Sequence, residues 1–335
     1  MDSRRLPLLG RLAMLACLPY LTLKLLWLLG FDIGVVDPHR FSRTTWVAAN
    51  AFTFLLDAVA AVVAYTLTRP AGRRTPAWLL LFPLWAASGL LIPLIAGVLG
   101  GSLAGVFTGL PHPMGSGNFL APWVFVVVYG GFTVEAVTLL GAFAVYAHQR
   151  WGNLLRLPLG ALPDTGTRAV QRIFLLPAAL LLALLGALDV LWGAGSTLGM
   201  DAAQADARTV ISAASDWSNG LLLLAGAVGL LLLVLPSPPP RLRVRTALAA
   251  AWTGSATAFA SAGWQWLATA VPAGLSSGAS PATTGLPGLT GALELCTGLT
   301  VLCAGAFALS ELTIGMRGNV TERMIVERSV PRTAT

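Results

Sequence analysis

Six ionisable side chains lie inside apolar stretches of this sequence or at their ends, where a charge is costly to bury. They are Lys24, Asp57, Glu135, Asp189, Asp216 and Glu294. Lys24 is the only lysine among the 21 lysine and arginine residues of the chain. A charge in hydrocarbon costs roughly 2.5–3.5 kcal/mol on insertion scales, so these residues are typical of ion pathways, proton relays and buried ion pairs.

Polar side chains repeat at helical spacing around several of these acids. The stripes are Asn50, Thr53 and Asp57; Ser212, Asp216 and Asn219; Thr290, Glu294 and Thr297; and Thr253, Thr257 and Ser261. Such spacing places each set on one face of a helix. We therefore predict a polar cavity that opens outward. The candidates for cavity lining or proton coupling are Asp57, Glu135, Asp216, Glu294, Asn50, Asn219 and Gln265.

Each charged position also has a structural interpretation. Lys24 either pairs with a buried acid or extends its long stem outward, so that the ammonium reaches the headgroups. Asp189 and Asp216 either line the cavity or are hydrated helix ends, and Glu294 lies close to the end of its span. Asp57 and Glu135 lie nearest mid-depth, where they either serve transport or hold helices together by hydrogen bonds.

The composition defines the class of protein that must position these residues. The chain has 335 residues, of which 56% are hydrophobic and 10% charged, whereas a soluble domain carries roughly 25% charged residues. Apolar runs of at least about 18 residues recur, each long enough to cross about 30 Å of hydrocarbon. The runs are continuous rather than alternating, which excludes a β-barrel. The sequence therefore predicts an all-α membrane protein.

We expect eight transmembrane helices, joined by connections of unequal charge. The spans are residues 12–33, 45–67, 77–100, 122–147, 171–194, 209–235, 246–271 and 289–313. Arginines concentrate in the N-terminal segment, in every second connection and in residues 314–335, which leaves only Arg40, Arg43 and Arg208 for the opposite side. Because basic loops stay in the cytoplasm, we expect a protein of the cell membrane with both termini and the tail in the cytoplasm.

The two halves of the chain resemble each other. The matched positions are Trp27 and Trp192, Gly30 and Gly195, Gly34 and Gly199, Trp85 and Trp252, and Ser88 and Ser255. Each half holds four spans, an even number, so both halves point the same way across the membrane. We therefore predict two parallel four-helix repeats, residues 1–150 and 151–313, related by an axis along the membrane normal.

The alignment of the two halves places Lys24 over Asp189. A buried cation and a buried anion each lower the cost of the other when they pair, and removing one strands a charge. We therefore predict an ion pair between Lys24 and Asp189 at the seam between the repeats.

The third span is followed by a glycine stripe, formed by Gly97, Gly101, Gly105 and Gly109. Small residues at this spacing let another helix approach closely. One interpretation is a packing face followed by an outer loop. The other is a broken or re-entrant element that lines a cavity.

Motifs of known chemistry are missing. Cys17, Cys296 and Cys303 lie in apolar segments without the spacing of a disulfide framework or metal site, so we predict neither a metal nor a cofactor. The chain has no H-E-x-x-H, Walker A or G-x-S-x-G motif, so no known enzymatic chemistry is favoured. The net charge of +7 lies in short loops, which indicates membrane topology rather than nucleic-acid binding.

Two segments carry a resemblance to a family. LPYLTLKLLWLLGFDIGV at 18–35 and PWVFVVVYGGF at 122–132 resemble a group of actinobacterial multi-pass membrane proteins of unassigned function. The resemblance implies lineage and location, and it transfers no site residues.

Three functions remain open from the sequence. One is a transporter or permease for a small molecule or ion. The second is a non-transporting subunit or sensor, whose arginine loops bind a protein partner. The third is a membrane enzyme of unrecognised chemistry. In each case the lipid bilayer is the first expected partner.

Overall fold

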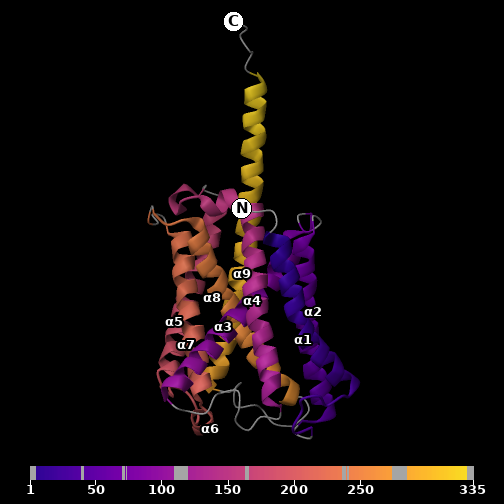
Figure 1. The fold of residues 1–335 in the computed structure, drawn as a ribbon. Coiled ribbons are helices and arrows are strands. Elements are labelled where there is room, and N and C mark those ends of the chain that lie inside the picture. The colour runs from indigo at the N-terminus through magenta and orange to yellow at the C-terminus, as the bar shows by residue number, and fades with distance from the viewer. Residues whose placement is uncertain are drawn as a thin grey trace.

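A computed structural model describes residues 5–38, 41–69, 72, 74–108, 120–162, 166–235, 239, 241–273 and 285–329, with only the backbone for 102–108, 268–273 and 313–329. These residues form α1 (Arg5–Leu29), α2 (Arg43–Thr68), α3 (Ala77–Thr108), α4 (Pro122–Arg156), α5 (Arg168–Gly193), α6 (Ala202–Asp206), α7 (Val210–Val234), α8 (Val244–Ala273) and α9 (Gly285–Ser329). The long helices lie roughly side by side in one bundle (Figure 1). A 3-10 turn, Leu159–Ala161, follows α4.

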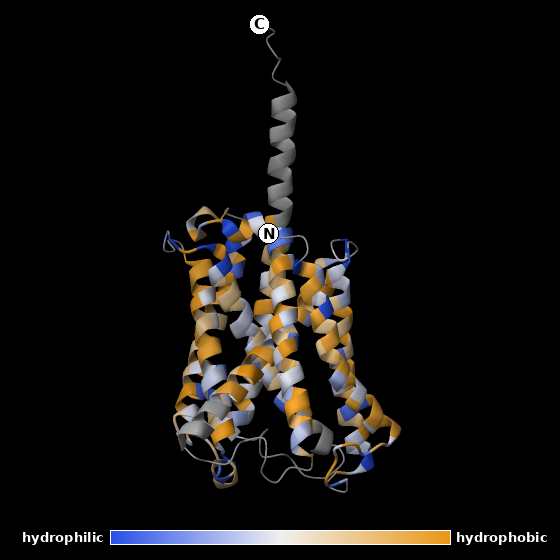
Figure 2. Ribbon diagram, in the orientation of Figure 1, coloured by the Kyte–Doolittle hydropathy of each residue, from blue (hydrophilic) through white to orange (hydrophobic). Residues whose placement is uncertain are grey.

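Seven helices of the described residues are long and apolar enough to cross a membrane. They are α1, α2, α4, α5, α7, residues Ala77–Gly101 of α3 and residues Gly285–Leu312 of α9. Figure 2 shows apolar residues along the sides of the bundle, and large apolar side chains such as Leu15 and Leu180 are exposed there. A surface of this kind suits contact with lipid rather than with water. The prediction of a multi-pass helical membrane protein is confirmed at this level.

α8 differs from the other long helices in composition. It has 30 residues, many of them alanine, serine, threonine and glycine, and it is not among the seven apolar helices. It packs against α3, α7 and α9 inside the bundle. α8 covers the predicted span 246–271 and is long enough to cross a membrane. That it forms an eighth span remains a prediction.

α1 and α5 end in the same way, as their matched sequences predict. Trp27 Nε1 donates a hydrogen bond to the Ile33 carbonyl at 2.8 Å. Trp192 Nε1 donates to the Leu198 carbonyl at 3.0 Å. Four glycines adopt positive φ at matched places, with Gly30 at 97°, Gly195 at 99°, Gly34 at 74° and Gly199 at 73°. These angles are open to glycine and disfavoured for other residues, so both copies of the sequence form one local structure.

α3 and α8 cross at a pair of reciprocal hydrogen bonds. Trp85 Nε1 donates to Ser255 Oγ at 3.1 Å, and Trp252 Nε1 donates to Ser88 Oγ at 2.8 Å. The helices approach closely here, since a Cβ on Gly89 would lie 2.0 Å from the Ala256 carbonyl oxygen. The tryptophan of each matched Trp-x-x-Ser segment therefore binds the serine of the other segment at this crossing.

α3 is longer than predicted and contacts both halves of the chain. It continues without a break past Pro93 to Thr108, so the part of the glycine stripe from Gly97 to Gly105 is helical. A Cβ on Gly97 would lie 3.4 Å from Ser215 of α7, and Gly101 is buried. Gly109 lies outside the described residues. The packing interpretation therefore fits the described part of this stripe.

Two pairs of facing glycines make further close contacts in the second half. Gly186 of α5 faces Gly220 of α7, and Gly226 of α7 faces Gly254 of α8. A Cβ on Gly254 would lie 2.4 Å from the Gly226 Cα. Because these neighbours are backbone atoms, they cannot turn aside as a side chain does, and the two glycine pairs fix how α7 packs against α5 and α8.

We predict that Gly254→Val lowers the unfolding temperature of the protein in detergent. The added side chain meets α7 backbone, and overpacking of this kind costs about 1–3 kcal/mol. Gly305→Val is the matched control, because Gly305 lies in α9 with no atom within 4 Å of an added Cβ. Thermal melts of the two variants measure the difference, and equal shifts would contradict the close α7–α8 contact.

Candidate functional site

A ladder of polar side chains joins α1 to α2. Cys17, Tyr20 and Lys24 are spaced i, i+3 and i+7 on α1, and Asn50, Thr53 and Asp57 have the same spacing on α2. The helices pack against each other and run antiparallel, so the two stripes meet rung by rung. The rungs are Lys24 with Asn50, Tyr20 with Thr53, and Cys17 with Asp57.

Lys24 forms the outermost rung. Its Nζ donates to Asn50 Oδ1 at 2.8 Å, and Asn50 Nδ2 donates to the Trp46 carbonyl at 2.8 Å. The ammonium also lies 4.9 Å from the ring centroids of both Tyr20 and Trp27. Cation–π contacts of this kind stabilise a charge that has lost its water. Lys24 is therefore held within the first half, and Asn50 is its direct partner.

The structure does not bring Lys24 and Asp189 together. α1 packs against α2 and α4, whereas α5, which carries Asp189, packs against α7 and α9. The two helices lie toward opposite sides of the bundle (Figure 1). No ion pair links the two residues in the described part of the chain, because the crossing between the halves is made by α3 and α8 instead of α1 and α5.

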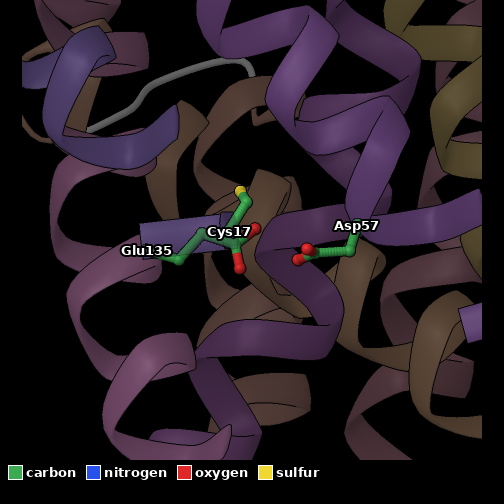
Figure 3. A group of neighbouring side chains, drawn as sticks. All are labelled: Cys17, Asp57 and Glu135. Carbon is green, nitrogen blue, oxygen red and sulfur yellow. The ribbon is translucent and has the colours of Figure 1, made fainter. Parts of the chain in front are cut away.

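The third pair, Cys17 with Asp57, lies beside Glu135 of α4, and the three residues form a buried cluster. Cys17, Asp57 and Glu135 of α4 are 1%, 5% and 3% exposed. A thiol or carboxylate atom from each lies within 4.8 Å of the others, and Figure 3 shows the Asp57 carboxylate directed toward Cys17 and Glu135. Asp57 Oδ2 is buried without a hydrogen-bond partner. The structure thus joins two predicted residues and adds a third, Cys17.

A second acidic cluster lies in the other half. Asp189 and Glu294 are buried, and Glu294 interacts electrostatically with both Asp189 and Asp216. Arg208 binds Asp216 at 2.7 Å and also donates to the Trp192 carbonyl at 2.6 Å. Asp189 and Asp216 occupy the positions equivalent to Lys24 and Asn50, so the second half carries acids where the first carries a cation and an amide.

The remaining candidates lie apart from these clusters. Asn219 Nδ2 donates to Ser261 Oγ at 3.0 Å, which joins α7 to α8. Gln265 lies on an exposed part of α8. A groove of about 590 Å³ lies between α3 and α7 and is lined mostly by apolar residues such as Ile92 and Leu221. None of the buried acids lines it, so it is not the predicted polar cavity.

Sequence reasoning missed Cys17, Tyr20 and Arg208. Cys17 and Tyr20 share the i, i+3, i+7 spacing with Lys24, and that spacing mirrors the stripe on the next span. Comparing the two stripes could have found the ladder. We predicted no metal site because the cysteines lack ligand spacing in sequence, but ligands from three different helices leave no such spacing. Arg208 was assigned to the outer side, and its partner Asp216 lies two helical turns further along.

The cluster of Cys17, Asp57 and Glu135 places two carboxyl groups close together, away from water. Two buried carboxylates repel each other, so the pair must hold a proton or a cation to remain buried. The thiol adds a sulfur ligand that becomes strongly coordinating when it loses its proton. The cluster is therefore chemically suited to bind a cation.

Comparisons with protein-family models, curated proteins and solved structures found no match. The fold and the site define a polytopic helical membrane protein with carboxyl groups buried between its helices. The resemblance of its first and fourth spans to actinobacterial membrane proteins stays a prediction.

We predict that Lys24→Met destabilises the protein and that Asn50→Leu in the same chain partly restores it. The single change leaves the buried Asn50 Oδ1 unsatisfied, which costs about 1–3 kcal/mol, whereas the double change removes both polar partners. Melting temperatures in detergent provide the measurement. Lys24→Met with Asp189→Leu is the control and should show no rescue; rescue by that pair instead would favour a Lys24–Asp189 contact.

Proposed function

We propose that the protein is a cation transporter of the cell membrane. Its intramembrane carboxyl groups are the single observation that carries the proposal. Asp57, Glu135, Asp189 and Glu294 are buried, and among the described residues none has a lysine or arginine within ion-pair distance. Unpaired acids in a membrane interior are typical of ion and proton pathways, since a purely structural role is met more cheaply by neutral hydrogen-bonding groups.

The proposed architecture is eight spans in two parallel four-helix repeats, with both termini in the cytoplasm. Its support comes from the matched ends of α1 and α5 and from the reciprocal bonds between α3 and α8. The start of α1 and the far end of α9 also lie toward the same end of the bundle (Figure 1). An even number of crossings produces this arrangement, and α8 supplies the eighth. The concentration of arginine at that end favours a cytoplasmic location.

Flux through vesicles tests this proposal. We expect purified protein in proteoliposomes to move at least one of H⁺, Na⁺, K⁺, Mn²⁺ and Zn²⁺ faster than protein-free vesicles, as followed by entrapped indicators. Glu135→Gln and Glu294→Gln should reduce the flux because each removes a buried anion. Asp206→Asn, at an exposed acid next to the membrane helices, is the matched control. Flux equal to that of empty vesicles for every ion would contradict transport.

A membrane-bound subunit is the second candidate function. α9 has 45 residues and continues from the bundle as a projecting helix to Ser329 (Figure 1). A helix that extends beyond its span candidate, Gly285–Leu312, into the charged sequence after Met316 is suited to contact a protein partner. This function predicts no cation flux in vesicles, so the same measurement distinguishes the two.

A further inference from the structure

We propose that Cys17, Asp57 and Glu135 form a binding site for a zinc-like divalent transition-metal ion. The proposal rests on the function proposed above, because it names the class of cation that the first half binds. The site is built by three helices, with one ligand each from α1, α2 and α4. All three residues lie deep inside the bundle, where only groups of matched charge can remain buried.

The geometry is close to that of a metal site before the ion enters. The three candidate ligand atoms lie within 4.8 Å of one another. Metal bonds of about 2.0–2.3 Å in a tetrahedral zinc site place the ligand atoms roughly 3.5 Å apart. A change of side-chain rotamer that moves each ligand atom inward by about 1 Å is enough to close the site.

An unsatisfied oxygen points to a missing ligand. Asp57 is 95% buried, because only 5% of its surface is exposed, and its Oδ2 lacks a hydrogen-bond partner. The side chain extends toward Cys17 and Glu135 (Figure 3). A buried acceptor without a partner is costly, and an ion bound between these three residues would satisfy it.

The donor set selects the class of ion. Ca²⁺ takes about six to eight oxygen ligands and Mg²⁺ about six, whereas this cluster offers two carboxylates and a sulfur. Most backbone carbonyls inside α1, α2 and α4 already accept helical hydrogen bonds, so the side chains are the main source of ligands. Thiolate sulfur with carboxylate oxygen suits Zn²⁺ and related ions. Three protein ligands leave a fourth position open for water or an exchanging ligand.

Charge balance assigns a role to the only lysine of the chain. A thiolate and two carboxylates carry three negative charges, the ion carries two positive charges, and Lys24 supplies the third. Lys24 lies two helical turns from Cys17 on α1 and interacts electrostatically with Asp57. The occupied site is therefore neutral as a whole, which is the condition that a membrane interior favours.

The acids of the second half do not form an equivalent site. Asp216 is already paired with Arg208, and the cysteines of α9, Cys296 and Cys303, are exposed. The second cluster therefore keeps two unpaired carboxyl groups, on Asp189 and Glu294, but the described residues place no buried cysteine beside them. The comparison assigns metal binding to the first half alone.

Cobalt binding to the full-length protein in detergent tests the site. We expect one Co²⁺ per chain, with tetrahedral visible bands and a near-ultraviolet thiolate-to-cobalt band, both displaced by Zn²⁺. Cys17→Ser should abolish the ultraviolet band, and Glu135→Gln should weaken binding. Cys296→Ser and Asp206→Asn, both at exposed positions, should leave both signals unchanged. A thiolate band that persists in Cys17→Ser would overturn the proposal.

A measurement on the unsubstituted protein covers the case in which a variant fails to fold. X-ray absorption of the zinc-loaded protein should show one sulfur neighbour at about 2.3 Å together with oxygen neighbours. A shell of oxygen alone, or no bound zinc after dialysis, would overturn the site. Metal binding without vesicle flux would remove the transport proposal and keep the site. Flux of another cation without metal binding would remove the metal site and keep the transport proposal.

Discussion

The cost of an unsatisfied polar group in hydrocarbon determines how these helices pair. Lipid offers no hydrogen bonds, so each polar atom must find its partner within the bundle. Many hydroxyl groups satisfy themselves locally, as Thr138 does by donating to the Val134 carbonyl one turn earlier. Groups that cannot do so join different helices, such as Lys24 with Asn50 and Trp85 with Ser255. The exceptions are few in the described residues, and one of them, on Asp57, lies in the candidate metal site.

The same constraint applies to the matched positions of the two halves, which carry different charges. At equivalent positions the first half has Lys24 and Asn50, and the second has Asp189 and Asp216. In the first half the amide of Asn50 binds Lys24. In the second half Arg208 pairs with Asp216, and Asp189 has no such cation beside it among the described residues. Matched positions of the two halves can therefore differ in the sign of their charge, while the positive-φ glycines that follow them adopt the same conformation.

Local sequence patterns predicted most of the helices. They did not predict which residues of different helices lie next to each other. Hydropathy and the matched turns after α1 and α5 depend on residues close in the chain. The alignment of the two halves shows which residues match in sequence, but residues of the two halves meet only where their helices cross. Trp85 and Ser255 lie at that crossing, whereas Lys24 and Asp189 lie away from it. Cys17 gave no signal alone, because its partners come from α2 and α4.

α3 has a mechanical consequence for any motion between the halves. Its first part, with Leu80 and Leu84, belongs to the apolar core of α1, α2 and α4. Its later part lies against α7, where Gly97 faces Ser215. The first part of α3 thus packs against helices of the first half, and its later part packs against α7 of the second half. Because α3 contacts helices of both halves, a movement of one half relative to the other requires α3 to rotate or slide against α8 where the two helices cross.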